Sequence, residues 1–261
     1  MTFTQACFLF IAAMLGGALT SIASGGAFIS FPALIFIGLP SINANATGMT
    51  AAWLGCAVSV AAYRHELSGQ QRISLVLGSI SLVGGMIGAL LLLYTPTSIF
   101  DRLIPYLLLF STLLFTFGGK ISTLLHHLGS RRSLLIASFM QFFIAVYGGY
   151  YGAGVAMLML ATMEVLGMKD IHKMNALKML LMSLNSGFAA ITYIIAGVVA
   201  WQPAFLMMLG TVVGGYGGAY YARKLQPDLV KRFVIIVGFA MTCYFFIREY
   251  TLTGFIQPFM R

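Results

Sequence analysis

Three polar side chains fall on one face of the apolar segment that begins near residue 172. Asn175, Lys178 and Asn185 are spaced, through Met182, at helical intervals of three, four and three residues, so they share one face of a helix. A charge inside a membrane costs about 2.5–3.5 kcal/mol unless it has a partner or an aqueous cavity. We therefore predict that Lys178 is a fixed positive charge for an anion and that the two asparagines orient the ligand. The alternative is a lysine that snorkels to the membrane boundary.

Two glycine-rich sequences each open a short apolar run, and both are candidates for breaks in membrane helices. The first contains Ser24, Gly25 and Gly26, and the second contains Gly152 and Gly154. A break leaves free N–H groups at the start of the next helix, and these groups attract anions. The other interpretation is close helix packing, which small residues permit. We predict that both openings contribute backbone N–H groups to a binding site.

Glu164 is the one acidic residue well inside an apolar run. A buried carboxyl group can titrate near neutral pH, which makes Glu164 a candidate for proton coupling. Its position one turn before Gly167 also suits the membrane interface, with Lys169 or Lys173 as a partner.

Motifs for catalysis or metal binding are missing from the sequence. It contains no HExxH, Walker A or Ser/His/Asp pattern, and Cys7, Cys56 and Cys243 lack CxxC spacing. We therefore expect no metal, no cofactor and no enzyme activity.

The composition is that of a membrane protein. Apolar residues make up 60% of the 261 residues and charged residues 8%, whereas soluble domains carry about 25% charged residues. The net charge of +9 is distributed over short clusters between apolar runs, as the positive-inside rule predicts for cytoplasmic loops. The expected surroundings are a lipid bilayer, and nucleic acid is not an expected partner.

Ten apolar segments can be recognised, and each is predicted to be a helix. They are about 5–22, 25–38, 43–63, 73–94, 103–118, 133–149, 153–168, 172–196, 202–221 and 231–248. The expected fold is therefore an all-α, polytopic integral membrane protein.

The two halves of the chain are related by an offset of 130 residues. The offset places Asn45 on Asn175, Gly84-Gly85 on Gly214-Gly215 and Arg102 on Arg232. We predict a first repeat at 1–119, a linker at 120–132 and a second repeat at 133–261, together forming one transport domain. Asn45 and Thr47 are the predicted site residues of the first repeat.

The distribution of loop charges indicates that the second repeat is inverted. Basic loops alternate with uncharged ones, and corresponding loops have opposite character. This pattern is expected when repeats of five segments each obey the positive-inside rule. Loops 64–72, 119–132, 168–172 and 222–232 are predicted to be cytoplasmic, with both termini outside.

Several motifs resemble the TauE/SafE family, the sulfite exporter and toluene-sulfonate uptake permease group. They are SGGAFISFPALIFIGLPSINANAT in the first half and GGYYGAG, LGMKDIHKMNALK and GGYGGAYYARKL in the second. The resemblance implies secondary transport of sulfur-containing anions such as sulfite, sulfonates or sulfoacetate across the cytoplasmic (inner) membrane.

The sequence thus predicts an alternating-access carrier for a small anion, with its site near the membrane midplane where the halves meet. The alternatives are an anion channel, an intramembrane enzyme or a subunit that anchors partners. A second copy of the chain, forming a homodimer, is a further candidate partner.

Overall fold

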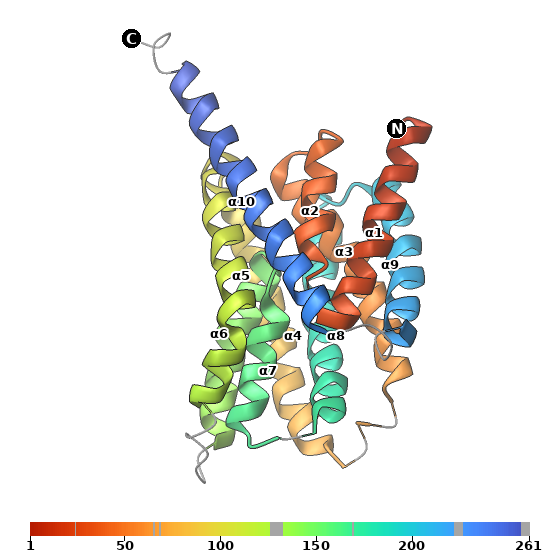
Figure 1. Cartoon of the computed structure of the whole chain (residues 1–261), viewed down its shortest axis with the longest axis vertical. Helices are drawn as coiled ribbons and strands as arrows, with labels where there is room; N and C mark the ends of the chain where they lie inside the picture. Colours follow the sequence, from red (N-terminus) through yellow and green to blue (C-terminus); the bar gives the residue numbers. More distant parts are fainter. Residues whose placement is uncertain are drawn as a thin grey trace.

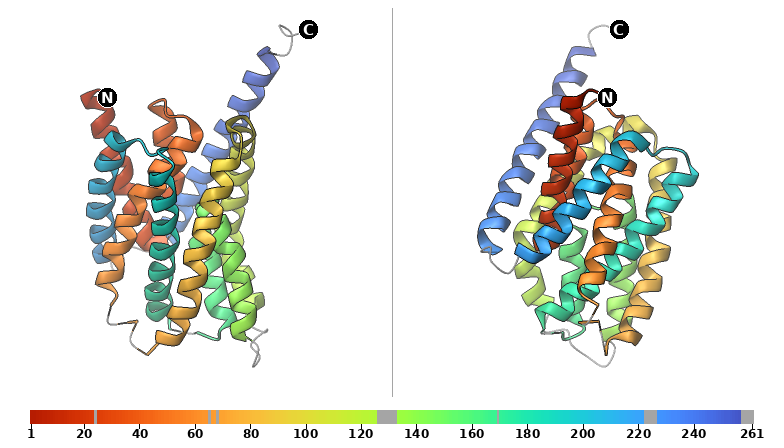
Figure 2. Two further views of the ribbon diagram at one scale, coloured as in Figure 1. Left: turned by 180° about the vertical axis from the view of Figure 1, so that it is seen from behind. Right: turned by 90° about the vertical axis from the view of Figure 1, so that its right-hand side faces the viewer.

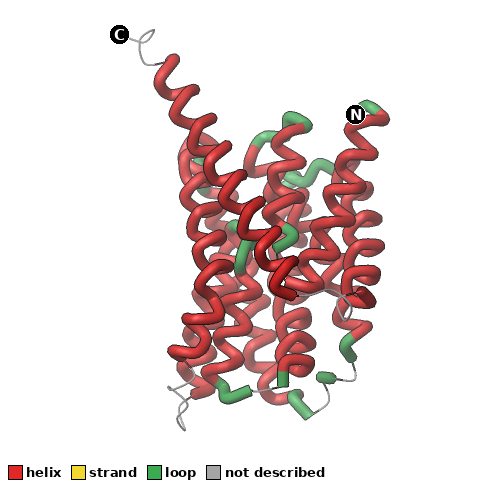
Figure 3. The backbone as a smooth tube through the Cα atoms, in the orientation of Figure 1, coloured by secondary structure: helices red, strands yellow, loops and turns green. Residues whose placement is uncertain are grey.

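The structure is a computed structural model that describes residues 1–23, 25–64, 66–67, 69–125, 133–168, 170–221 and 227–256. Within these ranges every regular element is an α-helix, and there are ten helices (Figures 1 and 3). The predictions of an all-α fold and of ten segments are therefore confirmed.

The helix bounds agree with the predicted segments except at the ends of the fifth and tenth helices. The helices are α1 Phe3–Ala23, α2 Ala27–Phe36, α3 Ser41–Ala62, α4 Gln71–Tyr94, α5 Thr97–Leu125, α6 Ser133–Tyr150, α7 Val155–Val165, α8 Ile171–Ile195, α9 Trp201–Tyr221 and α10 Pro227–Ile256. Apolar composition marks only the part of a helix that faces hydrocarbon, and the helix itself continues into polar sequence. The fifth helix consequently occupies residues 120–125, which the sequence assigned to a linker.

Helix lengths distinguish spanning helices from shorter ones. In the described chain, Phe3–Ser21, Gln71–Tyr94, Thr97–Leu114 and Ile171–Ile195 are long and apolar enough to cross a membrane. α2 and α7 have 10 and 11 residues, or about 15–17 Å at 1.5 Å per residue, half of a hydrocarbon core of about 30 Å. Each short helix is the returning arm of a hairpin, α1–α2 or α6–α7, whose tip lies inside the molecule (Figures 1 and 2).

The order and direction of the helices follow the predicted duplication. α1, α3, α4 and α5 start at residues 3, 41, 71 and 97, and α6, α8, α9 and α10 start at 133, 171, 201 and 227, each 130 residues later. Corresponding helices run in opposite directions, and both termini lie at one end of the molecule (Figure 1). α4 and α8 begin at the other end, and their first turns carry the exposed Arg72 and Lys173. The assignment of that end to the cytoplasm stays a prediction.

The two halves are interleaved in space. α1 packs along α9, and in the same way α6 packs along α4, while α3 and α8 contact each other at the centre. The fourth helix of each predicted repeat therefore packs against the first helix of the other repeat. A single half lacks a partner for these helices.

Glycines make the close contact between α1 and α9 possible. A Cβ on Gly210 would lie 2.7 Å from the Phe10 oxygen, and one on Gly214 would overlap the Met14 oxygen. The same relation holds between α4 and α6, where a Cβ on Gly84 or Gly88 would meet atoms of residues 145 to 150, and one on Gly149 would overlap the Gly85 oxygen. Gly84, Gly88, Gly214 and Gly218 thus serve packing, which is the role that small residues commonly have between membrane helices.

Replacing one of these contact glycines tests the packing. Gly214→Ala is expected to destabilise the detergent-solubilised protein by about 1–3 kcal/mol, because an extra methyl group must push α1 away. Gly217→Ala is the matched control on the same helix, since a Cβ there would meet no atom within 4 Å. Thermal unfolding followed by fluorescence measures both. Equal melting temperatures for the two variants would contradict the assigned contact.

Candidate functional site

The two glycine-rich openings are the tips of the two helical hairpins. The second tip joins α6 to α7, and Gly152 and Gly154 there have φ angles of 83° and 76°. Side chains other than glycine rarely adopt this left-handed conformation, so the break predicted at these residues is confirmed.

At the first tip, glycine is required because a side chain would not fit, and not because the backbone is left-handed. Gly26 has an ordinary helical φ of −62°, and a Cβ on Gly25 would lie 2.6 Å from the Val234 side chain of α10. Gly26 itself packs directly against Gly16 and Thr20 of α1. Ser24, the remaining predicted residue of this opening, lies outside the described residues.

Side chains from neighbouring helices satisfy the carbonyl groups that the second tip leaves free. Asn45 of α3 donates to the Tyr150 oxygen at 3.0 Å, and Tyr193 of α8 donates to the Gly149 oxygen at 2.6 Å. The Ala153 oxygen lies 3.1 Å from the Ser111 hydroxyl of α5 and accepts a hydrogen bond of 2.9 Å from Tyr147 of α6. Because a bilayer offers no water to such groups, a break is tolerated only where protein or a cavity provides partners.

Two more of the predicted polar residues also bind backbone groups. Asn185 of α8 donates to the Ala145 oxygen at 2.8 Å and to the Ser81 oxygen at 3.1 Å, which ties α8 to α6 and α4. Thr47 of α3 accepts a hydrogen bond of 3.0 Å from the Ala200 N–H, immediately before α9. These amide N–H and hydroxyl groups therefore position the helices around the two tips.

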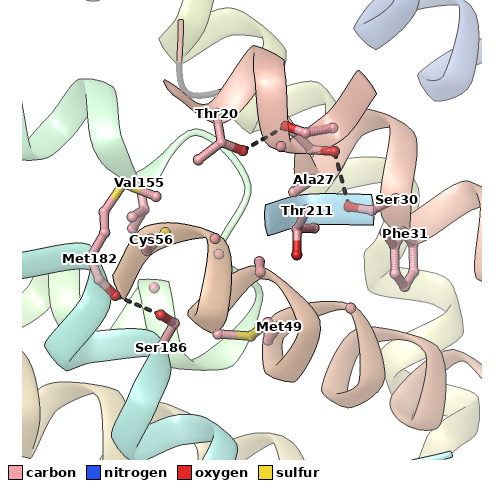
Figure 4. Close-up of a pocket in the computed structure, with 18 of the residues that line it drawn as sticks. Thr20, Ala27, Ser30, Phe31, Met49, Cys56, Val155, Met182, Ser186 and Thr211 are labelled. Carbon is pink, nitrogen blue, oxygen red and sulfur yellow. Dashed lines mark hydrogen bonds between the residues drawn. The ribbon is translucent and has the colours of Figure 1, made fainter. Parts of the chain in front are cut away.

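A cavity of about 90 Å³ lies between the two hairpin tips (Figure 4). A buried water requires about 10–15 Å³, so the space admits several waters or one small anion. Of the predicted site residues, Gly26, Asn45, Gly152 and Asn185 line the cavity. Gly25, Thr47, Gly154, Asn175 and Lys178 are not among its lining residues.

The serine and threonine hydroxyl groups around the cavity present acceptors to it. Each hydroxyl has a single proton, and every lining serine or threonine in the described chain donates that proton to a backbone carbonyl. The bonds run from Thr20 to Gly16, Ser21 to Gly215, Ser30 to Gly26, Ser59 to Gly55, Ser186 to Met182 and Thr211 to Ala51 (Figure 4 shows three of them). The Tyr151 hydroxyl at the second tip also lines the cavity and has no partner in the described chain, so it can donate there. The N–H of Val155, the first residue of α7, makes no backbone hydrogen bond in the described chain.

Lys178 is buried just behind the cavity wall. Its side chain is 1% exposed, and its ammonium group donates to the Asn175 Oδ1 at 3.0 Å. It interacts electrostatically with Cys56 of α3, which lines the cavity, and within the described chain no carboxylate forms an ion pair with it. Lys178 therefore does not snorkel to the surface, and in the part of the chain that the structure describes its ammonium group has one hydrogen-bond partner, the Asn175 oxygen.

Glu164 lies away from the cavity. It is half-buried and is the last residue but one of α7, at the end of the molecule where α8 begins (Figure 1). This position suits the interfacial interpretation, and a role in proton coupling stays a prediction.

Tyr151 is a cavity residue that the sequence did not single out. It is 2% exposed, lines the cavity, and packs edge-on against Phe31 of α2 at 5.7 Å between ring centroids. Its hydroxyl has no hydrogen-bond partner in the described chain. The motif GGYYGAG contains two tyrosines near a break, Tyr150 and Tyr151, but only the packing distinguishes their roles.

The tyrosine hydroxyls give a matched pair of substitutions. Tyr193→Phe removes the hydrogen bond to the Gly149 oxygen and leaves a buried carbonyl with fewer partners, so we expect a loss of about 1–3 kcal/mol. Tyr151→Phe removes a hydroxyl that has no partner and should be neutral or stabilising. Thermal unfolding of both purified variants measures the difference, and a larger loss in Tyr151→Phe would refute the assignment.

Comparisons with known proteins converge on one family. The family model described as "Sulfite exporter TauE/SafE" matches residues 9–245, a range that includes both hairpins and the cavity. No solved structure matches the chain.

Curated relatives span nearly the whole chain. A "Probable membrane transporter protein" of Haemophilus influenzae is 29% identical over 239 residues, covering 90% of this chain and 91% of its own. YfcA of Escherichia coli, also a probable membrane transporter, is 28% identical over 241 residues, covering 90% and 87%. The ORF9 protein of Sinorhizobium sp., which has the same description, is 25% identical over 242 residues, covering 92% of both chains.

Proposed function

Because the chain belongs to the TauE/SafE sulfite exporter family, we propose that it is a secondary transporter for a small sulfur-containing anion of the sulfite, sulfonate or sulfoacetate class. Membership makes it a multi-pass membrane transporter. The substrate, the alternating-access mechanism and a location in the cytoplasmic membrane are parts of the proposal.

The observation that carries the proposal is the buried ammonium of Lys178 beside the cavity. An unpaired charge in a membrane interior is costly, and its described neighbours supply only the Asn175 oxygen and the Cys56 thiol. A substrate that brings a negative charge compensates this cost when it binds. The free N–H groups at the start of α7 add favourable interactions for an anion.

The arrangement of the hairpins supports alternating access over a permanently open pore. Two inverted repeats that meet at a central site give a transporter two related conformations, one open to each side. The matching helix starts and the exchanged packing of α1 with α9 and α6 with α4 fit this design. An anion channel is the competing function, and it predicts flux that does not saturate.

Transport by purified protein in liposomes tests the proposal. We expect saturable uptake of radiolabelled sulfite, methanesulfonate or sulfoacetate, and faster uptake when the same anion is present inside. Flux without saturation and without this counterflow would favour the channel, and a new chemical product would reveal an enzyme. Absence of anion flux would remove the proposed function.

The same assay measures the contribution of Lys178. Lys178→Met should weaken apparent anion affinity at least tenfold, equivalent to about 1.4 kcal/mol, because it removes the positive charge. Lys178→Arg keeps the charge but should change selectivity among the anions, since a planar guanidinium binds differently from an ammonium. Equal affinity in wild type and Lys178→Met, with both proteins well folded, would exclude this role.

A further inference from the structure

The two halves of the chain contribute unequally to the lining of the cavity. α3 lines it along most of its length, from Ala44 to Ser59, whereas its counterpart α8 contributes only Met182, Asn185 and Ser186. The α1–α2 hairpin likewise contributes more than the α6–α7 hairpin, which reaches the cavity mainly at its tip. A cavity with the symmetry of the two repeats would be lined equally by α3 and α8.

The residues that would complete such a space are present on α8, where Lys178 and Met179 are fully buried and Asn175 is half-buried. The offset of 130 residues pairs Asn45 with Asn175, Gly48 with Lys178 and Met49 with Met179. The first member of each pair lines the cavity. Of the second members, Lys178 and Met179 are 1% and 0% exposed, and the Lys178–Asn175 hydrogen bond links two of the three.

The two sets of residues differ in chemistry. The set on α3 carries no charge, and the serine and threonine hydroxyl groups that share the cavity with it donate their protons to carbonyls. The set on α8 carries the ammonium group of Lys178, at the position that corresponds to Gly48 in the set on α3. An anion in the present cavity is therefore separated from the positive charge that the proposed function requires.

We propose that Asn175, Lys178 and Met179 form a second half-site on α8, which binds a small sulfonate or sulfite anion when the cavity opens to the opposite side of the membrane. This inference rests on the proposed function and specifies how it is divided between two conformations. In the present conformation Asn45, Gly48 and Met49 form the wall of the cavity and the second half-site is closed. In the opposite conformation the roles are exchanged, and the anion meets the Lys178 ammonium directly.

One consequence concerns the affinities on the two sides. The conformation open along α8 offers a cation to the anion, and the residues that line the cavity along α3 are all uncharged. The affinity for the anion is therefore expected to be at least tenfold higher in the conformation open along α8. Closing the half-site on α8 lowers this affinity before the anion is released.

Paired cysteine variants test the exchange without requiring a known substrate. Met49→Cys and Met179→Cys are matched positions with the same native residue, placed in a background without Cys7, Cys56 and Cys243 whose folding and flux are checked first. In the resting protein, N-ethylmaleimide should modify position 49 and not position 179. The controls are Ala46→Cys and Ala176→Cys, because both alanines are fully buried and neither lines the cavity.

A bulky side chain in the open half-site shifts the population. Gly48→Phe fills the present cavity, where a Cβ would make only an ordinary contact of 3.4 Å with Leu34, and so penalises the conformation open along α3. The modification rate at position 179 should then rise at least tenfold while position 176 stays unreactive. Ala52→Phe, at another lining position, serves the same purpose if Gly48→Phe does not fold.

The outcomes separate this inference from the proposed function. If position 179 remains as unreactive as position 176 in a folded variant with a filled cavity, the second half-site does not exist, whatever the anion flux. If positions 176 and 179 become reactive together, the helix has loosened as a whole and the inference is equally wrong. Loss of the proposed function shows instead as absent anion flux in the wild-type protein, which these labelling rates do not depend on.

Discussion

The need to satisfy backbone hydrogen bonds inside a bilayer governs this structure. The hairpin tip between α6 and α7 frees carbonyl groups at membrane depth, where water is not available. Asn45 and Tyr193 supply missing donors from α3 and α8, and Ser111 of α5 lies within hydrogen-bonding distance of the Ala153 oxygen. The break therefore holds three helices in fixed positions, and the cavity lies beside the same tip.

Small residues then determine how the halves combine. Glycines on α9 let α1 approach in backbone contact, and glycines on α4 do the same for α6. Van der Waals packing of this kind drives helix association in lipid. The hydrophobic effect does not contribute there, because the lipid tails are as apolar as the side chains. Because each contact joins helices from different halves, the fold closes only when both halves are present, and α3 and α8 are left facing each other at the centre.

Electrostatics distinguishes the two halves that the backbone makes similar. Lys178 stands on α8 where α3 has Gly48, so one half of the central region carries a charge and the other has room for a cavity. The ammonium is withheld from solvent by its own burial and by the Asn175 amide. A transporter benefits from such asymmetry, since an anion must be bound firmly in one conformation and released in another.

The sequence by itself determined the features that depend on local patterns. Apolar runs indicated ten helices, and the offset of 130 residues indicated which helices correspond. Gly152 and Gly154 indicated a break between two helices, because glycine adopts a left-handed φ at little steric cost. Even so, composition could not locate the ends of α5 and α10, since helical hydrogen bonding continues past the apolar run.

Only the tertiary structure decided what the polar side chains do. Asn45, Asn185 and Thr47 were predicted to face a ligand, and each forms a hydrogen bond with backbone groups of distant helices or loops, up to 153 residues away along the chain. Lys178 proved buried and outside the present cavity, and Tyr151 proved to be a cavity residue with an unpartnered hydroxyl. Such partners depend on which helices pack together, and that choice rests on the summed contacts of many residues distant in sequence, which no local pattern contains.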